Sequence, residues 1–116
     1  MAIKQRKLCK VSADLELMVD RAKQATGFLK ALSHESRLLI LCILSEGEKS
    51  VTNLEELLAL RQSTVSQQLA RLRLDGLVKT KRDGKTIYYN LVNDDIRTIL
   101  AALYEVFGKK QKRGAR

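Results

Sequence analysis

The chain has 116 residues, of which 45% are hydrophobic and 30% charged, the balance of a single globular domain. It has no proline and only 4% aromatic residues, which argues against an all-β sandwich with its many turns. The longest apolar run, Leu38–Leu44, is too short to span a membrane. The basic N-terminus is not followed by an apolar stretch of the length that a signal peptide needs. We therefore expect a cytoplasmic protein whose two cysteines are reduced, without a structural disulfide framework.

The net charge of +9 is carried by the two ends of the chain. Four lysines and arginines fall within the first ten residues and five within the last eight, whereas the charges between them balance. We interpret residues 1–11 as a basic flexible arm, residues 12–108 as the folded domain and residues 109–116 as a basic flexible tail. Such ends favour a polyanionic partner by counterion release from phosphates. The alternative is that they only aid solubility.

Apolar residues at helical spacing dominate the first part of the domain. They predict a helix from Ala13 to Leu32 and a second one from His34 to Ser45, with Ser33 as its N-cap and Gly47 as its stop. The second helix is apolar on every side, so we expect it to be buried. A strand competes for so short a run, but the serine before it and the glycine after it favour a helix.

A short strand at Lys49–Val51 precedes two further helices. Thr52, with Glu55 three residues later, predicts a capping box for a helix from Asn53 to Ala59. The residues of this helix expected to face inward are Leu54, Leu57 and Leu58.

The next helix begins at Gln62 or Ser63, either of which is a candidate cap, and runs to Leu74. It ends at Asp75-Gly76, where glycine can adopt the left-handed conformation. Its expected core positions are Val65, Leu69 and Leu72.

The hydrophobic period then changes from 3.6 to 2. Two strands, Leu77–Arg82 and Lys85–Leu91, are joined by Asp83-Gly84, a strong hairpin signal. A last helix starts at Asp94. The hairpin residues expected in the core are Ile87, Tyr89 and Leu91, and the apolar stripe of the last helix is Ile96, Ile99, Leu100, Leu103, Val106 and Phe107. The resulting mainly α (α+β) order, α-α-(β)-α-α-β-β-α, describes a winged helix-turn-helix.

The helix from Ser63 to Leu74 has a polar face suited to a DNA major groove. It contains short hydroxyls, two amides and one guanidinium, and no acidic residue precedes Asp75. Glutamine can pair with adenine edges and arginine with guanine edges or phosphate. The predicted DNA-binding residues here are Ser63, Thr64, Ser66, Gln67, Gln68 and Arg71. The alternative is an ordinary solvated helix face.

The hairpin adds a cationic element beside this helix. Its basic residues are placed to contact the DNA backbone or minor groove, which adds affinity and salt dependence more than specificity. They are Lys79, Lys81, Arg82 and Lys85. Tyr88 faces either DNA or the rest of the sheet.

Three stretches of the sequence resemble the ArsR/SmtB family of winged-helix repressors. They are Leu29–Leu38 (LKALSHESRL), Gln62–Arg73 (QSTVSQQLARLR) and Gly76–Val78 with Tyr88-Tyr89. The resemblance implies a transcriptional repressor that binds operator half-sites one helical turn apart. It also implies a homodimer that forms through the first and last helices and often leaves DNA when an inducer binds.

Metal sensing does not fit this sequence. Family members that bind metal carry cysteine pairs on the helix before the reading helix, or aspartate and histidine on the last helix. Here Thr52–Leu58 contains no cysteine, and no histidine follows Asp94. His34 is the only histidine, and one imidazole cannot form a zinc site without partners. We therefore expect no metal and no cofactor.

The chain is most similar to a branch that responds to sulfide, persulfide or oxidants through two cysteines. Cys42 occupies the position of the first cysteine of that branch, whereas Gly108 follows Leu103–Phe107 where the second is usual. One hypothesis is that Cys9, among basic residues that favour its thiolate, replaces the missing partner and links to Cys42. The alternatives are that Cys42 is plain core and that the repressor has no cysteine switch or another inducer.

Functions of other classes have little support. The lone histidine has no nucleophile at motif spacing, and the sequence has no glycine-rich phosphate loop, so we expect no enzyme. A winged helix that binds protein or RNA is a remote alternative, since RNA-binding modules usually present stacking aromatics.

Overall fold

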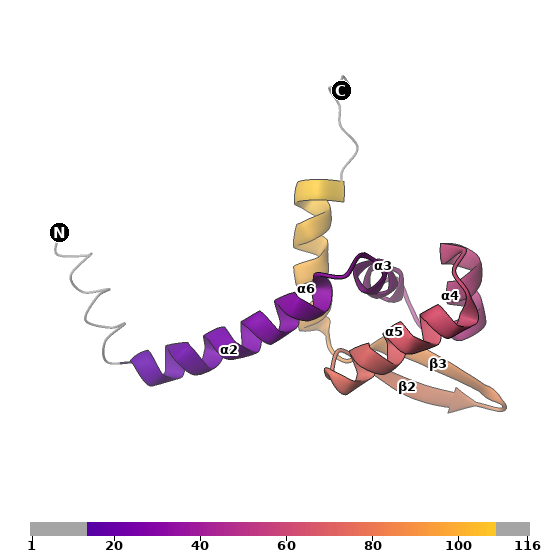
Figure 1. The fold of residues 1–116 in the computed structure, drawn as a ribbon, viewed down its shortest axis with the longest axis horizontal. Helices are drawn as coiled ribbons and strands as arrows, with labels where there is room; N and C mark the ends of the chain where they lie inside the picture. The colour runs from indigo at the N-terminus through magenta and orange to yellow at the C-terminus, as the bar shows by residue number, and fades with distance from the viewer. Residues whose placement is uncertain (1–13, 109–116) are drawn as a thin grey trace, which may run out of the picture.

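The computed structural model of the protein describes residues 14–108. Its elements follow the predicted order and are α2 (Leu15–Leu32), α3 (Glu35–Leu44), β1 (Lys49–Ser50), α4 (Val51–Leu58), α5 (Gln62–Leu74), β2 (Val78–Asp83), β3 (Thr86–Leu91), α6 (Asp94–Leu103) and the π-helical segment η1 (Tyr104–Gly108). This is a mainly helical winged helix-turn-helix fold (Figure 1). Among the described residues, no helix has both the length and the apolar character needed to cross a membrane. The predicted basic ends at 1–11 and 109–116, and Cys9 with them, lie outside the described residues.

The core lies where α3, α4 and α5 pack against one another and against the sheet. Leucine and isoleucine at i, i+3 and i+4 give each helix one apolar face, and burying these faces together is the main stabilising contribution to the fold. The fully buried large side chains are Ile40, Leu41, Leu44, Leu54, Leu69, Leu72 and Val65. The predicted core face of α5 is therefore confirmed.

The sheet is antiparallel, with strand order β1-β3-β2. Asp83 pairs with Thr86, so the turn residues are Gly84 and Lys85 rather than the predicted Asp83-Gly84. Gly84, the first turn residue, has a positive φ of 66°, whereas Lys85, the second, does not. This combination is that of a type II′ hairpin turn. The hairpin itself is confirmed, and its turn is shifted by one residue.

Two predicted helix caps are wrong because neighbouring residues take the extended backbone that a cap needs. Ser33 instead ends α2, where its hydroxyl donates to the carbonyl of Lys30, and His34 is the N-cap of α3. Ser50, the last residue of β1, caps α4 in place of Thr52: its Oγ accepts from the backbone N–H of the residue three positions on, which reciprocates in a capping box. Pairing of β1 with β3 keeps the chain extended up to Ser50, so the helix can begin directly after it.

Several apolar residues predicted to face the core are exposed. Leu57 of α4 and Ile87 of β3 are both exposed. In α4 the core side is formed by Leu54 and, one turn later, Leu58, and Leu57 lies off this row. Ile87 lies near the hairpin end, opposite Arg82. Tyr89 is half-buried against the core, and Leu91 is buried as predicted.

Helix α3 is buried on one side only, contrary to the prediction that it is buried all round. Leu39 and Cys42 are exposed, whereas the core side of the helix is fully buried. Outward-facing apolar residues on a folded domain often mark a surface that another chain covers.

Most of the exposed large apolar side chains of the described residues lie on α2, on α6 and on η1, which continues α6. Figure 1 shows α2 projecting from the body of the domain and α6 rising beside α3. The exposed large apolar side chains of α2, α6 and the following η1 are Leu15, Leu17, Met18, Val19, Leu29, Ile99, Tyr104, Val106 and Phe107. Within the predicted stripe of the last helix, Ile96 and Leu100 are buried and Leu103 packs against the core, whereas Ile99, Val106 and Phe107 are exposed.

Candidate nucleic-acid interface

Helix α5 is held rigidly by its inner face. Val65, Leu69 and Leu72 each have 0% exposure and pack into the core between α3, α4 and β2. A three-residue connection from Ala59, in the left-handed conformation, separates α4 from α5. The N-cap of α5 is Arg61, which makes no side-chain capping bond. The prediction that Gln62 or Ser63 is the cap is therefore wrong.

The outer face of α5 brings together the predicted reading residues. Ser63, Ser66 and Gln67 are exposed, whereas Thr64 and Gln68 are half-buried at the edge of the face. Arg71 is exposed, and its Nε lies 3.4 Å from the carboxylate of Asp75 one turn later. Since such an exposed pair is weak, the guanidinium is free to exchange its partner for a phosphate or a base edge.

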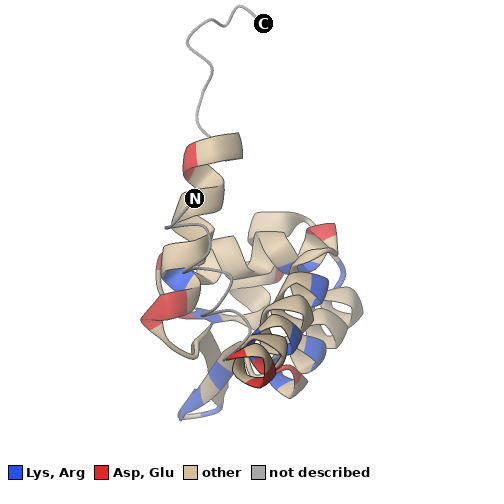
Figure 2. Cartoon of the chain, turned by 90° about the vertical axis from the view of Figure 1, so that its left-hand side faces the viewer, with Lys and Arg blue, Asp and Glu red and all other residues tan. Residues whose placement is uncertain are grey.

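The hairpin carries the predicted cations on one extended element next to α5. Figure 2 shows Lys and Arg gathered on the hairpin at the lower edge of the molecule. All four predicted residues, Lys79, Lys81, Arg82 and Lys85, are exposed.

Two of the hairpin cations have partners within the chain. The Nζ of Lys81 lies 3.1 Å from Oε1 of Glu48, just before β1. The Nε of Arg82 donates to the carbonyl of Gly84 at 3.2 Å, which holds the guanidinium beside the turn. The guanidinium of Arg82 is thus held at the hairpin end, whereas the ammonium of Lys81 is paired with a carboxylate.

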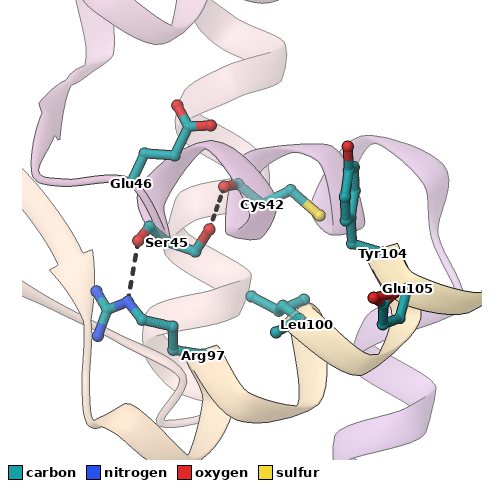
Figure 3. A pocket seen from close by; sticks show the side chains of 8 residues that line it. Cys42, Ser45, Glu46, Arg97, Leu100, Tyr104 and Glu105 are labelled. Carbon is teal, nitrogen blue, oxygen red and sulfur yellow. Dashed lines mark hydrogen bonds between the residues drawn. The ribbon is translucent and has the colours of Figure 1, made fainter. Parts of the chain in front are cut away.

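Cys42 is on the far side of α3 from α5 and lines a cavity of about 540 Å³ between α3 and α6. In Figure 3 its sulfur points into the space between the two helices, near Tyr104. Cys42 is exposed as a residue, but the atoms around its sulfur partly bury the thiol. This partial burial raises the pKa of the thiol, and the negative charge of Glu46 raises it further. Less thiolate is therefore present at neutral pH than in a free cysteine, so Cys42 is a weaker nucleophile.

The ring of Tyr104 occupies the space beside Gly108. A Cβ at position 108 would lie 2.6 Å from Cδ1 of that ring, so any larger residue requires the tyrosine to move. The glycine at this position therefore belongs to the way η1 packs.

The family comparison covers α3 to α5 and the start of β2. Residues 34–80 match the model of bacterial regulatory proteins of the arsR family. A biofilm growth-associated repressor of Agrobacterium fabrum is 44% identical over 93 residues, which are 80% of this chain and 80% of that protein. The chain belongs to the ArsR family.

Solved structures of regulators agree with this ArsR assignment. The transcriptional repressor BigR from Xylella fastidiosa is 43% identical, with a TM-score of 0.73 over 79% of this chain and 94% of that one. Reduced HlyU from Vibrio cholerae is 37% identical, with a TM-score of 0.76 over 81% and 99%. A homodimeric winged helix-turn-helix domain from Mycobacterium bovis is 30% identical, with a TM-score of 0.69 over 76% and 82%.

The protein is therefore a transcriptional repressor of the ArsR type, as predicted from the sequence. Its relatives are regulators and not enzymes. Among residues 14–108, no group of three or more His, Cys, Asp or Glu side chains is arranged to hold a metal ion.

Two residues near the interface were missed by the sequence analysis. Arg37 donates to Gln68 of α5, and Glu48 pairs with Lys81 of the hairpin. The available signal for Arg37 was its place directly before the apolar run that begins at Leu38, because a charge packed beside such a run needs a partner. Nothing local in the sequence singles out Glu48.

Proposed function

We propose that this ArsR-family repressor binds a duplex operator as a homodimer, with α5 in the major groove and the hairpin on the DNA backbone. The observation that carries the proposal is the division of α5 into a fully buried apolar face and an outer face of hydroxyls, amides and arginine. Specificity then comes from Gln67, Gln68 and Arg71, which can reach base edges. Ser63, Thr64 and Ser66 suit phosphate or base contacts.

The proposed dimer forms through α2 and α6. Both helices expose apolar residues that the core of one chain leaves uncovered. Such a surface is costly in water and is stabilised when a second copy covers it. A homodimer with two-fold symmetry presents two copies of α5 to operator half-sites one helical turn apart.

The hairpin and the chain ends supply the nonspecific part of binding in this proposal. Lys79, Lys81, Arg82 and Lys85 neutralise phosphates, and the basic segments 1–11 and 109–116 add attraction over a longer range. A repressor of this kind acts where the chromosome is, so the cytoplasm is the compartment that the proposal requires.

The test is selection of duplex sites from a random pool, followed by binding measurements on variants. We expect Gln67→Ala or Gln68→Ala to relax the base preference at single positions. Lys81→Ala or Arg82→Ala should weaken all duplexes alike and reduce the slope of log K against log salt by about 0.9 per lost phosphate contact. Equal effects of both classes on every duplex contradict these roles, and preferential competition by RNA favours the alternative of an RNA-binding module.

Release of DNA by thiol chemistry at Cys42 and Cys9 stays a hypothesis. Its support is that Cys42 lines an open cavity between α3 and α6. Against it stand the raised pKa of that thiol and the glycine at position 108, which favour a repressor with no cysteine switch or another inducer. Mass spectrometry after persulfide or peroxide treatment decides: an intramolecular Cys9–Cys42 link supports the switch. Normal release of DNA by the Cys9→Ser and Cys42→Ser proteins refutes it.

A further inference from the structure

Arg37 lies where three helices meet. It stands in the first turn of α3, and its side chain is half-buried. Its Nε donates to the carbonyl of Ala31 at 2.9 Å, and its Nη1 donates to Oε1 of Gln68 at 3.4 Å. One guanidinium therefore connects the last turn of α2, the start of α3 and the outer edge of α5.

The bond to Ala31 fixes the guanidinium. Ala31 is 3% exposed and lies in the last turn of α2, where backbone carbonyls lack a partner within the helix. A charged donor satisfies this carbonyl, and because the guanidinium is planar, the direction of Nη1 is set by the same bond. Arg37 thus presents a donor to α5 from a fixed position.

The bond to Gln68 sets the direction of its carboxamide. With Oε1 turned toward Arg37, the amide NH₂ of Gln68 lies on the opposite side of the same planar group. Gln67, its neighbour, is exposed, and Arg37 does not hold it. The two adjacent glutamines therefore differ: the carboxamide of Gln68 is oriented, whereas no residue within 14–108 holds that of Gln67.

This difference has a consequence for base reading. A bidentate contact with adenine needs both the oxygen and the nitrogen of a glutamine on the base edge. Gln67 is not constrained in this way and can provide both. At Gln68 the bond turns the oxygen toward Arg37 and occupies one of its two lone pairs, so the N–H donors are the part of this carboxamide left to face a base. Such donors suit the acceptors of the major groove, namely purine N7, guanine O6 and thymine O4.

We propose that Arg37 is a positioning residue for specificity, which orients Gln68 so that its N–H donors, rather than its oxygen, read one base position. The inference rests on the proposed function, since it requires α5 to read DNA. Arg37 itself touches no base in this scheme and acts only through Gln68.

The experiment uses the full chain and a duplex chosen by selection with the wild-type protein. Affinities are measured for that duplex and for duplexes changed at each base position, with wild-type, Arg37→Lys, Gln68→Ala and the double variant. Arg37→Lys keeps the positive charge but loses the planar fork, so long-range attraction to DNA is preserved. Arg21→Lys, the same exchange at an exposed arginine of α2, is the matched control for the substitution itself.

We expect Arg37→Lys to lower discrimination between bases about threefold to tenfold, which is the effect expected for the loss of one hydrogen bond. The loss should occur at the position that Gln68→Ala affects, with no further loss in the double variant. A uniform loss on all duplexes, or independent effects of the two substitutions, overturns the inference in favour of a purely structural arginine. If Gln68→Ala relaxes the site and Arg37→Lys does not, only this inference fails. If the wild-type protein selects no site, the proposed function fails with it.

A measurement on the unsubstituted protein covers the case in which Arg37→Lys does not fold. The side-chain NH₂ of Gln68 should show a higher NMR order parameter than that of Gln67, because one carboxamide is held and the other is free. Equal order parameters for the two amides overturn the inference.

Discussion

Glu48→Gln is expected to strengthen DNA binding by this repressor. In the free protein the carboxylate of Glu48 lies 3.1 Å from the Nζ of Lys81, with 64% of the lysine side chain and 40% of the glutamate side chain exposed. Under the proposed function, Lys81 must turn from this carboxylate to a phosphate when DNA binds. The substitution removes the competing partner and leaves a side chain of similar size.

The magnitude follows from the exposure of the pair. Ion pairs this open to solvent contribute about 0.2–1 kcal/mol, so releasing Lys81 should raise affinity about 1.4-fold to fivefold at low salt. The gain should be the same for all duplexes, because phosphate contacts carry no sequence information. The salt slope should steepen by at most about 0.9, the value for one phosphate neutralised.

Fluorescence anisotropy titrations between about 50 and 200 mM salt measure both quantities. Glu16→Gln is the matched control, since it removes the same charge from the first turn of α2, which Figure 1 places at the far end of the domain from the hairpin. The gain should also disappear in a Lys81→Ala background. A loss of affinity, or an equal gain with and without Lys81, refutes the reasoning.

Three further predictions concern stability and reactivity. Leu69→Ala, at 0% exposure, should lower the free energy of unfolding by about 2–5 kcal/mol, whereas Leu74→Ala, at 78% exposure on the same helix, should change it by less than about 0.5 kcal/mol. Urea denaturation at fixed protein concentration measures both values. Similar losses in the two variants refute the assignment of the helix faces. Ser50→Ala should lower the free energy of unfolding by about 1 kcal/mol through loss of the α4 cap, whereas Thr52→Ala should lower it little. The reverse order in the same assay would show that Thr52 is the cap. Because burial raises the pKa of the Cys42 thiol, its alkylation at pH 7–8 should be slower in the native than in the urea-unfolded chain, as followed by peptide mass spectrometry; equal rates contradict the raised pKa.

The local sequence pattern was sufficient to predict the order of the elements and the two faces of α5. Apolar residues at i, i+4 and i+7 in α5 allow only one face of the helix to be buried. The three expected positions, Val65, Leu69 and Leu72, are all buried. The change to a period of 2 around a glycine likewise predicts the hairpin, because a turn with positive φ costs little only at glycine. These features depend on steric rules and patterning within a few residues.

The exact caps and turn positions were not predicted, because pairing between distant strands decided them. Partnering of β1 with β3 keeps the chain extended to Ser50, and the register of β2 and β3 moves the turn to Gly84 and Lys85. Serine and threonine are similar as caps in isolation, so the choice between neighbouring candidates depends on where the backbone is extended.

The sequence by itself determined the fold class, the positions of the positive charges and the residue types that α5 presents to solvent. Only the tertiary structure decided which of these side chains have partners. Arg37 and Gln68 are 31 residues apart in the chain, and their contact exists because α3 packs on α5. No periodicity encodes such a contact, since it depends on the relative placement of two helices, and that placement is set by the buried core as a whole.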